Sequence, residues 1–441
     1  MKLTEWDQQV VEQVNILADE LVELCQDLIR IPSWDRDTRG EAEVAHRVGK
    51  TLEKRNIPTE YLSSHPNIEN LIATWQVKKG ERRLLFNGHV DVVPPGEDWT
   101  VDPFTAEVRD DLIYGRGAMD MKGGVAAMTI AMCALRDLDI PLNGSLILNA
   151  VGDEERQGQL GTTWCIENAW EKIKADAAII PEPSGLGQLG YAVNIGEKGP
   201  VWLRITTKGE KAHGSIPAAG RNAIDLMMQL LQALQHTPLP TTTPPISRNA
   251  ILTQFAKALG VELSLMEGQF QGGRNPLSAG LEALTTTTMN IGVIKGGAAA
   301  NVVPDRCEVQ IDFRILPGQH PQEIVNFVRT LATECGLIDI VDVEIIEAFA
   351  GNSIPDYQQN EMVTTLYNTS KDIMGPTVYF LVPYATDARL LRRAGLTSSV
   401  VYGPGNMTQA HVADESISID ALIKVTKVLA VSALRFLGVK K

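Results

Sequence analysis

Apolar and polar residues follow two different periods along the chain. Apolar residues recur at three- and four-residue spacing over residues 6–31 and 41–55, which predicts two helices, the first ended by Pro32. Shorter apolar runs and further helical patterns then alternate. The runs that predict strands are residues 71–77, 83–93, 145–152 and 177–182, and the patterns that predict helices are residues 122–138 and 161–173. This alternation predicts an α/β fold with a mixed, largely parallel sheet flanked by helices.

The pattern changes after residue 197. Strand, helix, strand, strand, helix and strand are predicted in turn over residues 201–348, the order of a ferredoxin-like α+β domain. A Pro- and Thr-rich stretch opens a long insertion over residues 236–283, which we expect to be irregular. Beyond residue 349 the α/β pattern returns and ends in a helix over residues 422–438. We therefore expect a discontinuous main domain (residues 1–197 and 350–441) that carries an inserted domain (residues 198–349).

Charge and composition narrow the function. Asp and Glu total 54 against 40 Lys and Arg, a formal net charge of −14, which argues against nucleic-acid backbones and anionic membranes as partners. The five cysteines are scattered and include no CxxC pair, as expected for reduced thiols in a cytoplasmic enzyme. The first residues lack the apolar core of a signal peptide, and no run is long enough to predict a transmembrane helix.

Several acidic and histidine residues stand where predicted strands end. His89 and Asp91 lie two apart in GHVDVVP, so their side chains share one face, and Asp91 can orient the His89 ring. Glu154 and Glu155 follow the strand over residues 145–152, and Glu182 follows the next one. Taken singly, each has an ordinary alternative, because polar strand ends and solvated acidic turns are common.

Two further residues lie in glycine-rich loops. Asp120 stands in GRGAMDMKGG before a helix, where an isolated Asp is commonly an N-cap. His411 stands in GPGNMTQAHVADES after a strand. Open α/β sheets bind ligands at the carboxyl ends of their strands, so these loops are expected to meet the strand-end residues. Two histidines and three carboxylates suit a pair of divalent ions, with Zn²⁺, Co²⁺ or Mn²⁺ favoured.

Eight ordered motifs carry a family resemblance. They are GHVDVVP, GRGAMDMKGG, EERQGQLGT, PEPS, KAHGSIP, GGAAANVVPD, DFRI and GPGNMTQAHVADE. In this order they resemble the acetylornithine deacetylase / succinyl-diaminopimelate desuccinylase family of dinuclear zinc amidohydrolases, which also includes aminoacylases, carboxypeptidase G and several peptidases. The resemblance extends from about residue 20 to the C-terminus, although the segment over residues 236–283 is longer than in compact members.

The resemblance implies a metal centre with assigned roles. His89 and Glu182 would hold one zinc, Glu155 and His411 the other, and Asp120 would bridge them, with a cis peptide to Met121. Asp91 would orient His89, and Glu154 would be the general base for a water bridging the two metals.

The resemblance also assigns roles to the inserted domain, which would be a lid that carries a homodimer contact. His213 would reach the neighbouring subunit's site and stabilise the oxyanion, while Asn301 and Arg314 would bind substrate. Without the family, His213 is a histidine in a glycine loop and Arg314 a strand arginine that pairs with an acid.

The resulting prediction is a metal-dependent hydrolase of N-acyl amino acids or related N-acylated amines. An exopeptidase or dipeptidase with the same dinuclear centre, and an N-formyl amine deformylase, remain alternatives. A catalytically silent scaffold is disfavoured because every expected ligand and acid is present. A nucleotide-binding site is disfavoured because the glycines match neither a P-loop nor a dinucleotide motif.

Overall fold

A computed structural model describes residues 3–76, 82–264 and 276–439. Within these ranges it contains a nine-stranded sheet, a four-stranded sheet and two small sheets. The helices are α1 (Glu5–Ile16), α2 (Ala18–Ile29), α3 (Gly40–Glu53), α4 (Lys122–Asp137), α5 (Thr162–Ile173), α6 (Ala223–His236), α7 (Arg248–Leu259), α9 (Pro276–Thr285), α10 (Pro321–Glu334), α11 (Glu361–Ile373), α12 (Asp387–Arg393) and α13 (Ile419–Leu437). None of the helices in the described residues is long and apolar enough to cross a membrane.

The large sheet is mixed, as predicted. Its strands are β1 (Thr59–His65), β2 (Ile68–Gln76), β3 (Arg82–His89), β6 (Gly144–Val151), β7 (Ala177–Gly185), β8 (Tyr191–Glu197), β15 (Asn352–Ser353), β16 (Thr377–Val382) and β17 (Ser399–Asn406). The central order β6-β3-β7-β17 is parallel, whereas β1, β2 and β15 pair antiparallel towards the two edges. Parallel pairing is therefore confined to the centre and to β16 beside β8, and is less extensive than the sequence predicted.

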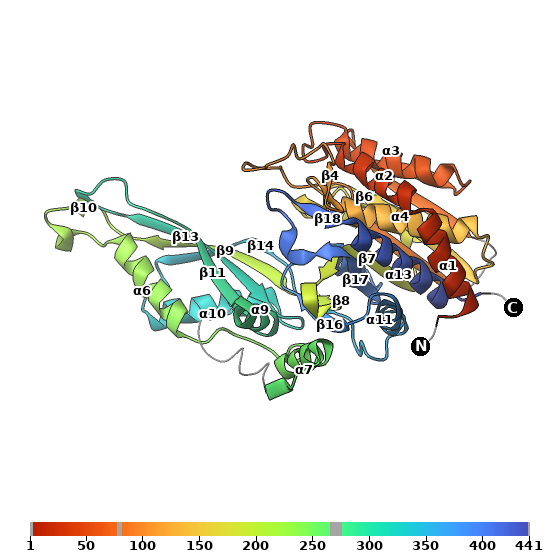
Figure 1. Cartoon of the computed structure of the whole chain (residues 1–441). Helices are drawn as coiled ribbons and strands as arrows, with labels where there is room; N and C mark the ends of the chain where they lie inside the picture. Colours follow the sequence, from red (N-terminus) through yellow and green to blue (C-terminus); the bar gives the residue numbers. More distant parts are fainter. Residues whose placement is uncertain (1–2, 77–81, 265–275, 440–441) are drawn as a thin grey trace.

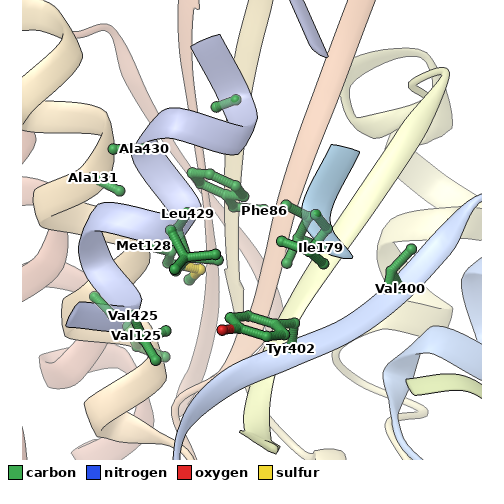
Figure 2. Close-up of a cluster of buried hydrophobic side chains, with 14 of the residues drawn as sticks. Phe86, Val125, Met128, Ala131, Ile179, Val400, Tyr402, Val425, Leu429 and Ala430 are labelled. Carbon is green, nitrogen blue, oxygen red and sulfur yellow. The ribbon is translucent and has the colours of Figure 1, made fainter. Parts of the chain in front are cut away.

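Helices cover both faces of this sheet. On one face, α4 and α13 pack against the central strands, and Figure 2 shows Met128 and Leu429 of these helices beside Phe86 of β3. On the other face, α5 and α12 pack over the adjacent positions of the same strands, including Leu85. Both faces of the central strands are buried, which explains why β3, β6 and β7 appear in the sequence as continuous apolar runs rather than alternating ones.

The four-stranded sheet lies in a separate lobe (Figure 1). Its strands β9 (Gly199–Lys208), β11 (Thr288–Gly296), β13 (Arg306–Ile315) and β14 (Val341–Ala348) pair antiparallel in the order β11-β13-β9-β14. Helices α6 and α10 pack on one face and form a hydrophobic core with β9 and β13. The chain leaves the large sheet at Glu197 and re-enters it at Asn352. A division into domains near residues 198 and 350 stays a prediction.

Two small sheets complete the described strands. A three-stranded sheet joins β18 (Ser416–Ser418), β5 (Leu112–Tyr114) and β4 (Val108–Arg109), and so brings the loop around Asp120 next to the segment around His411. A ladder of β10 (Ala212–His213) with β12 (Val302–Val303) lies at the far tip of the smaller lobe (Figure 1).

Some local expectations were wrong. The helix predicted over residues 6–31 is two helices, because the backbone leaves helical geometry at Leu17. The insertion over residues 236–283 is not irregular throughout, since it contains α7 and most of α9, while residues 265–275 lie outside the described residues. Strands β1, β8 and β16 were not anticipated. Strand β1 is only partly buried and β8 contains Asn194 and Gly196, whereas β16 is mostly buried and its short run TVYFLV was not recognised as a strand.

Candidate active site

The carboxyl ends of the central strands bring the predicted residues together. His89 ends β3, Glu154 and Glu155 follow β6 in a 3₁₀ turn, and Glu182 lies near the end of β7. His411 follows β17, and Asp120 lies between β5 and α4, joined to Met121 by the cis peptide that the resemblance implied. The expectation that these strand ends and loops meet at one edge of the sheet is thus confirmed.

His89 faces two carboxylates. Its Nε2 lies 3.1 Å from Oδ1 of Asp120 and 3.2 Å from Oε1 of Glu182. Its Nδ1 lies 3.0 Å from the backbone carbonyl of Asp91, and because a carbonyl only accepts, Nδ1 must carry the proton. With the ring neutral and both carboxylates ionised, Nε2 would therefore point its lone pair at two groups that only accept hydrogen bonds.

His411 repeats this arrangement on the other side of Asp120. Its Nε2 lies 3.1 Å from Oδ2 of Asp120 and 3.2 Å from Oε1 of Glu155. Each oxygen of the Asp120 carboxylate thus faces a different histidine, and each histidine has a glutamate of its own. The side chain of His411 is 50% exposed, whereas that of His89 is 1% exposed, so one half of the cluster opens to solvent.

Divalent cations fit these two groups of ligands. Two ligand atoms that each lie ~2.0 Å from a tetrahedral ion are ~3.3 Å apart, close to the four nitrogen–oxygen distances above. A cation between an imidazole lone pair and two carboxylates would also remove the mismatch of acceptors around Nε2. The atoms of His89, Asp120 and Glu155 that could bind a metal all lie within 4.8 Å of one another, so the group around His89 and the group around His411 adjoin each other.

The charges of the cluster shift several pKa values. Hydrogen bonds to Asp120 and Glu155 raise the pKa of His411 to about 10. Burial, together with the charge of Asp120, raises the pKa of Glu182 to about 8. Burial also raises the pKa of Glu154 well above its usual value. Without a compensating cation, the cluster therefore retains protons that free side chains would have lost at neutral pH.

Asp91 has a different geometry from the one the sequence suggested. Its Oδ1 is 3.5 Å from Nδ1 of His89, farther than its own backbone carbonyl. The two carboxylate oxygens instead accept hydrogen bonds from the backbone N–H groups of Glu154 and Glu155, each at 3.0 Å. Asp91 is fully buried, so it fixes the turn that presents both glutamates. The carboxylate of Glu154 has no hydrogen-bond partner among the described residues and lines the cavity described below.

Glu415 is a site residue that sequence reasoning missed. Its Oε1 accepts hydrogen bonds from the backbone N–H groups of Gly117, Met119 and Asp120 at 3.0, 2.8 and 3.1 Å, and its Oε2 pairs with Arg116. This buried carboxylate holds the loop that carries Asp120. The available signal was its position four residues after His411 in AHVADES, directly after Asp414.

A cavity of about 280 Å³ opens above the cluster. Its walls include Asp120, Glu154, Glu155, Glu182 and His411, together with Tyr384 and Thr386 from the loop between β16 and α12. Burial and the nearby carboxylates of Glu182 and Asp120 raise the pKa of Tyr384 well above its usual value, so its phenol keeps its proton. Sequence reasoning did not single out this loop.

The predicted catalytic residue His213 and the predicted substrate-binding residues Asn301 and Arg314 do not line this cavity. His213 is exposed on β10, with its Nδ1 2.7 Å from Oγ of Ser215. Asn301 is its neighbour, because the N–H of Gly214 donates to the Asn301 carbonyl at 2.7 Å. Arg314 lies on β13, where its Nε is 3.0 Å from Oδ1 of Asp312. The structure therefore does not bring these three residues to the cluster around Asp120 within one chain.

Comparison with known proteins shows which family the chain belongs to. The profile described as Peptidase family M20/M25/M40 matches residues 85–435, more than half of the chain. An N-formyl-4-amino-5-aminomethyl-2-methylpyrimidine deformylase of Halalkalibacterium halodurans is 28% identical over 96% of this chain and 95% of its own length. A probable succinyl-diaminopimelate desuccinylase of Staphylococcus aureus is 24% identical over 96% of this chain and 98% of its own.

A solved structure has the same fold. The M20 family metallo-carboxypeptidase Sso-CP2 from Sulfolobus solfataricus superposes with a TM-score of 0.70 at 21% identity, covering 94% of this chain and 98% of its own. The fold and the clustered ligands define the class of metal-dependent hydrolases that act on amide bonds. Within that class, the chain belongs to peptidase family M20/M25/M40, which confirms the resemblance found in the sequence.

Proposed function

We propose that this protein hydrolyses the amide bond of a small N-acylated amino acid or amine with the help of two divalent cations, of which Zn²⁺ is the first choice. The observation that supports this most is the shared Asp120 carboxylate, whose two oxygens face His89 and His411 at 3.1 Å each. His89, Asp120 and Glu182 would hold one cation, and His411, Asp120 and Glu155 the other. Co²⁺ or Mn²⁺ would fit the same oxygen and nitrogen ligands.

The chemistry divides between the cations and the protein. When bound, the cations supply Lewis acidity towards the amide carbonyl and an acidified water. Glu154 accepts the proton of the attacking water and returns it to the leaving amine, because its carboxylate lines the cavity without a partner. Asp91 keeps Glu154 in place through the turn hydrogen bonds, and the buried walls around Glu182 limit access of bulk water.

The smaller lobe would complete the site. In this proposal it acts as a lid and carries a homodimer contact. His213 would then enter the neighbouring subunit's cavity and stabilise the oxyanion. Asn301, next to His213, and Arg314 would contact substrate, Arg314 through a carboxylate. The exposed position of His213 and its distance in the fold from the cavity support a role that needs a second subunit.

Deformylation of an N-formyl amine is the second candidate. The deformylase relative matches nearly the whole chain. Within the described residues the cavity wall has four carboxylates and neither Arg nor Lys, so apart from His411 and the proposed cations it offers no positive charge to a substrate carboxylate. An uncharged or cationic N-formyl amine therefore suits this wall, whereas an N-acyl amino acid needs a cation from the smaller lobe.

A substrate screen tests the proposal. Chelated protein reloaded with Zn²⁺ or Co²⁺ is assayed for release of primary amine from N-acetyl and N-succinyl amino acids, N-formyl amines and dipeptides. We expect cation-dependent hydrolysis of at least one class, and the class separates deacylase, deformylase and peptidase. Binding of the cations without hydrolysis of any class would contradict the proposal.

A further inference from the structure

Tyr384 carries a donor that the protein itself does not use. Tyr384 lines the cavity above the ligand cluster, and its hydroxyl oxygen is buried. No group in the described part of the chain forms a hydrogen bond with that oxygen. A buried hydroxyl without a partner costs free energy, so its retention at this point favours a partner that arrives from outside the chain.

The loop around Tyr384 is fixed by other residues. The backbone N–H of Thr386 donates to Oε2 of Glu197 at 2.6 Å, and its hydroxyl donates to Oε1 at 3.1 Å. Glu197 is itself buried and pairs with Arg392 at 3.0 Å. The hydroxyl of Thr386 is therefore committed, whereas that of Tyr384 takes no part in holding the loop and stays available.

The surroundings of Tyr384 select the kind of partner. The carboxylates of Asp120, Glu154, Glu155 and Glu182 share the cavity wall with it, and ionised carboxylates only accept hydrogen bonds. A substrate carbonyl seated over the ligand cluster gains negative charge on its oxygen during attack and needs donors. The phenol of Tyr384 is a donor on the wall that also carries Glu182 and Asp120.

We propose that the Tyr384 hydroxyl donates a hydrogen bond to the carbonyl oxygen of the substrate as that oxygen becomes negative. This inference rests on the proposed amide hydrolysis and adds a donor from the same chain to the one expected from His213. Loss of one such donor lowers kcat by about 10²–10³ in other hydrolases, which sets the size of the expected effect.

The first test compares two tyrosine variants. Tyr384→Phe removes the hydroxyl and keeps the ring, so kcat is expected to fall about a hundredfold, with a smaller change in KM and an unchanged cation content. Tyr379→Phe is the matched control, because Tyr379 lies on the preceding strand β16 and is not part of the cavity wall. Its ring stacks on that of Tyr367, with the ring centroids 4.4 Å apart. Near-normal kcat in Tyr384→Phe, or loss of its cations, would overturn the inference.

The second test does not depend on knowing the substrate. Acetohydroxamate is titrated into Co²⁺-loaded protein and followed by the visible absorption of the cobalt. If Tyr384 donates a hydrogen bond to the anionic oxygen of acetohydroxamate, Tyr384→Phe should bind it about tenfold more weakly than wild type. Tyr379→Phe should bind it with the affinity of wild type. Equal affinities would refute the role of Tyr384. If wild type binds cobalt and acetohydroxamate but hydrolyses no amide, the proposed function fails while this titration still decides on Tyr384.

Discussion

Replacement of Glu154 by glutamine separates proton transfer from cation binding. The side chain keeps its length, and the backbone N–H of residue 154 keeps its bond to Asp91. No hydrogen bond of the Glu154 carboxylate is lost among the described residues. We therefore expect Glu154→Gln to fold, to bind cations as wild type does, and to lose most of its turnover.

The size of the loss follows from the role of the carboxylate. General acid–base catalysis contributes about 10²–10⁴ in rate, equivalent to about 2.7–5.4 kcal/mol of activation free energy. Since Glu154 would act twice, once as base and once as acid, we expect the upper part of that range. KM should change little, because the carboxylate holds no substrate group in its resting state.

The neighbouring glutamate provides a matched control. The backbone N–H of Glu155 donates to the other carboxylate oxygen of Asp91, also at 3.0 Å, but the Glu155 carboxylate faces His411. Glu155→Gln should therefore lower the affinity for one cation at least about tenfold. Even the loss of a residue that only hydrogen-bonds to a metal ligand lowers metal affinity about 10–100-fold. Both variants are measured by kcat with the best substrate and by calorimetric titration of the chelated protein with Zn²⁺. Near-normal kcat in Glu154→Gln, or loss of cations in that variant, would refute the division of roles.

Three further predictions follow from the same geometry. The pKa of His411 is raised to about 10 in the cation-free protein, so a cation must displace its proton at neutral pH. Cation affinity, measured by titration between pH 6 and 8, should therefore rise about tenfold per pH unit for each proton displaced. An affinity that does not change with pH would contradict this prediction. Glu415→Gln breaks the buried pair with Arg116 and should cost about 3–5 kcal/mol in the free energy of unfolding, measured with urea; a loss below 1 kcal/mol would show that the pair is dispensable. His213→Ala should lose rate and keep its cations, and mixing it with Glu154→Gln should restore part of the activity; no restoration in a mixed dimer would exclude a site shared between subunits.

The clustering of the proposed metal ligands could be predicted from the sequence because strand ends locate residues in an α/β sheet. His89, Glu155 and Glu182 each follow an apolar run that is long enough to be a buried strand. Parallel central strands then place their carboxyl ends along one edge, whatever the details of the loops. The order of the motifs supplied Asp120 and His411, whose loops carry no such positional rule.

Residues that depend on long-range placement could not be located in this way. The relation of His213 to the cavity depends on the orientation of the smaller lobe and on a second subunit. No local pattern in KAHGSIP encodes either of these. Glu415 and Tyr384 were missed because their importance lies in what they touch, three backbone N–H groups in one case and a cavity wall in the other.

The errors in local structure have physical reasons as well. Apolar periodicity continues across Leu17, and α2 begins without a side-chain cap, so nothing in the sequence marks the break between α1 and α2. The insertion did contain a readable signal for α7. Ser247 caps its N-terminus by accepting from the N–H of Ala250 at 3.2 Å, and Gly260 ends it with a φ of 67°.

The most direct measurement of the central claim is anomalous diffraction at the zinc edge from crystals of the zinc-loaded protein. The account predicts two peaks per chain, one within reach of His89, Asp120 and Glu182 and the other within reach of His411, Asp120 and Glu155. A single peak, or peaks that do not share Asp120, would contradict it.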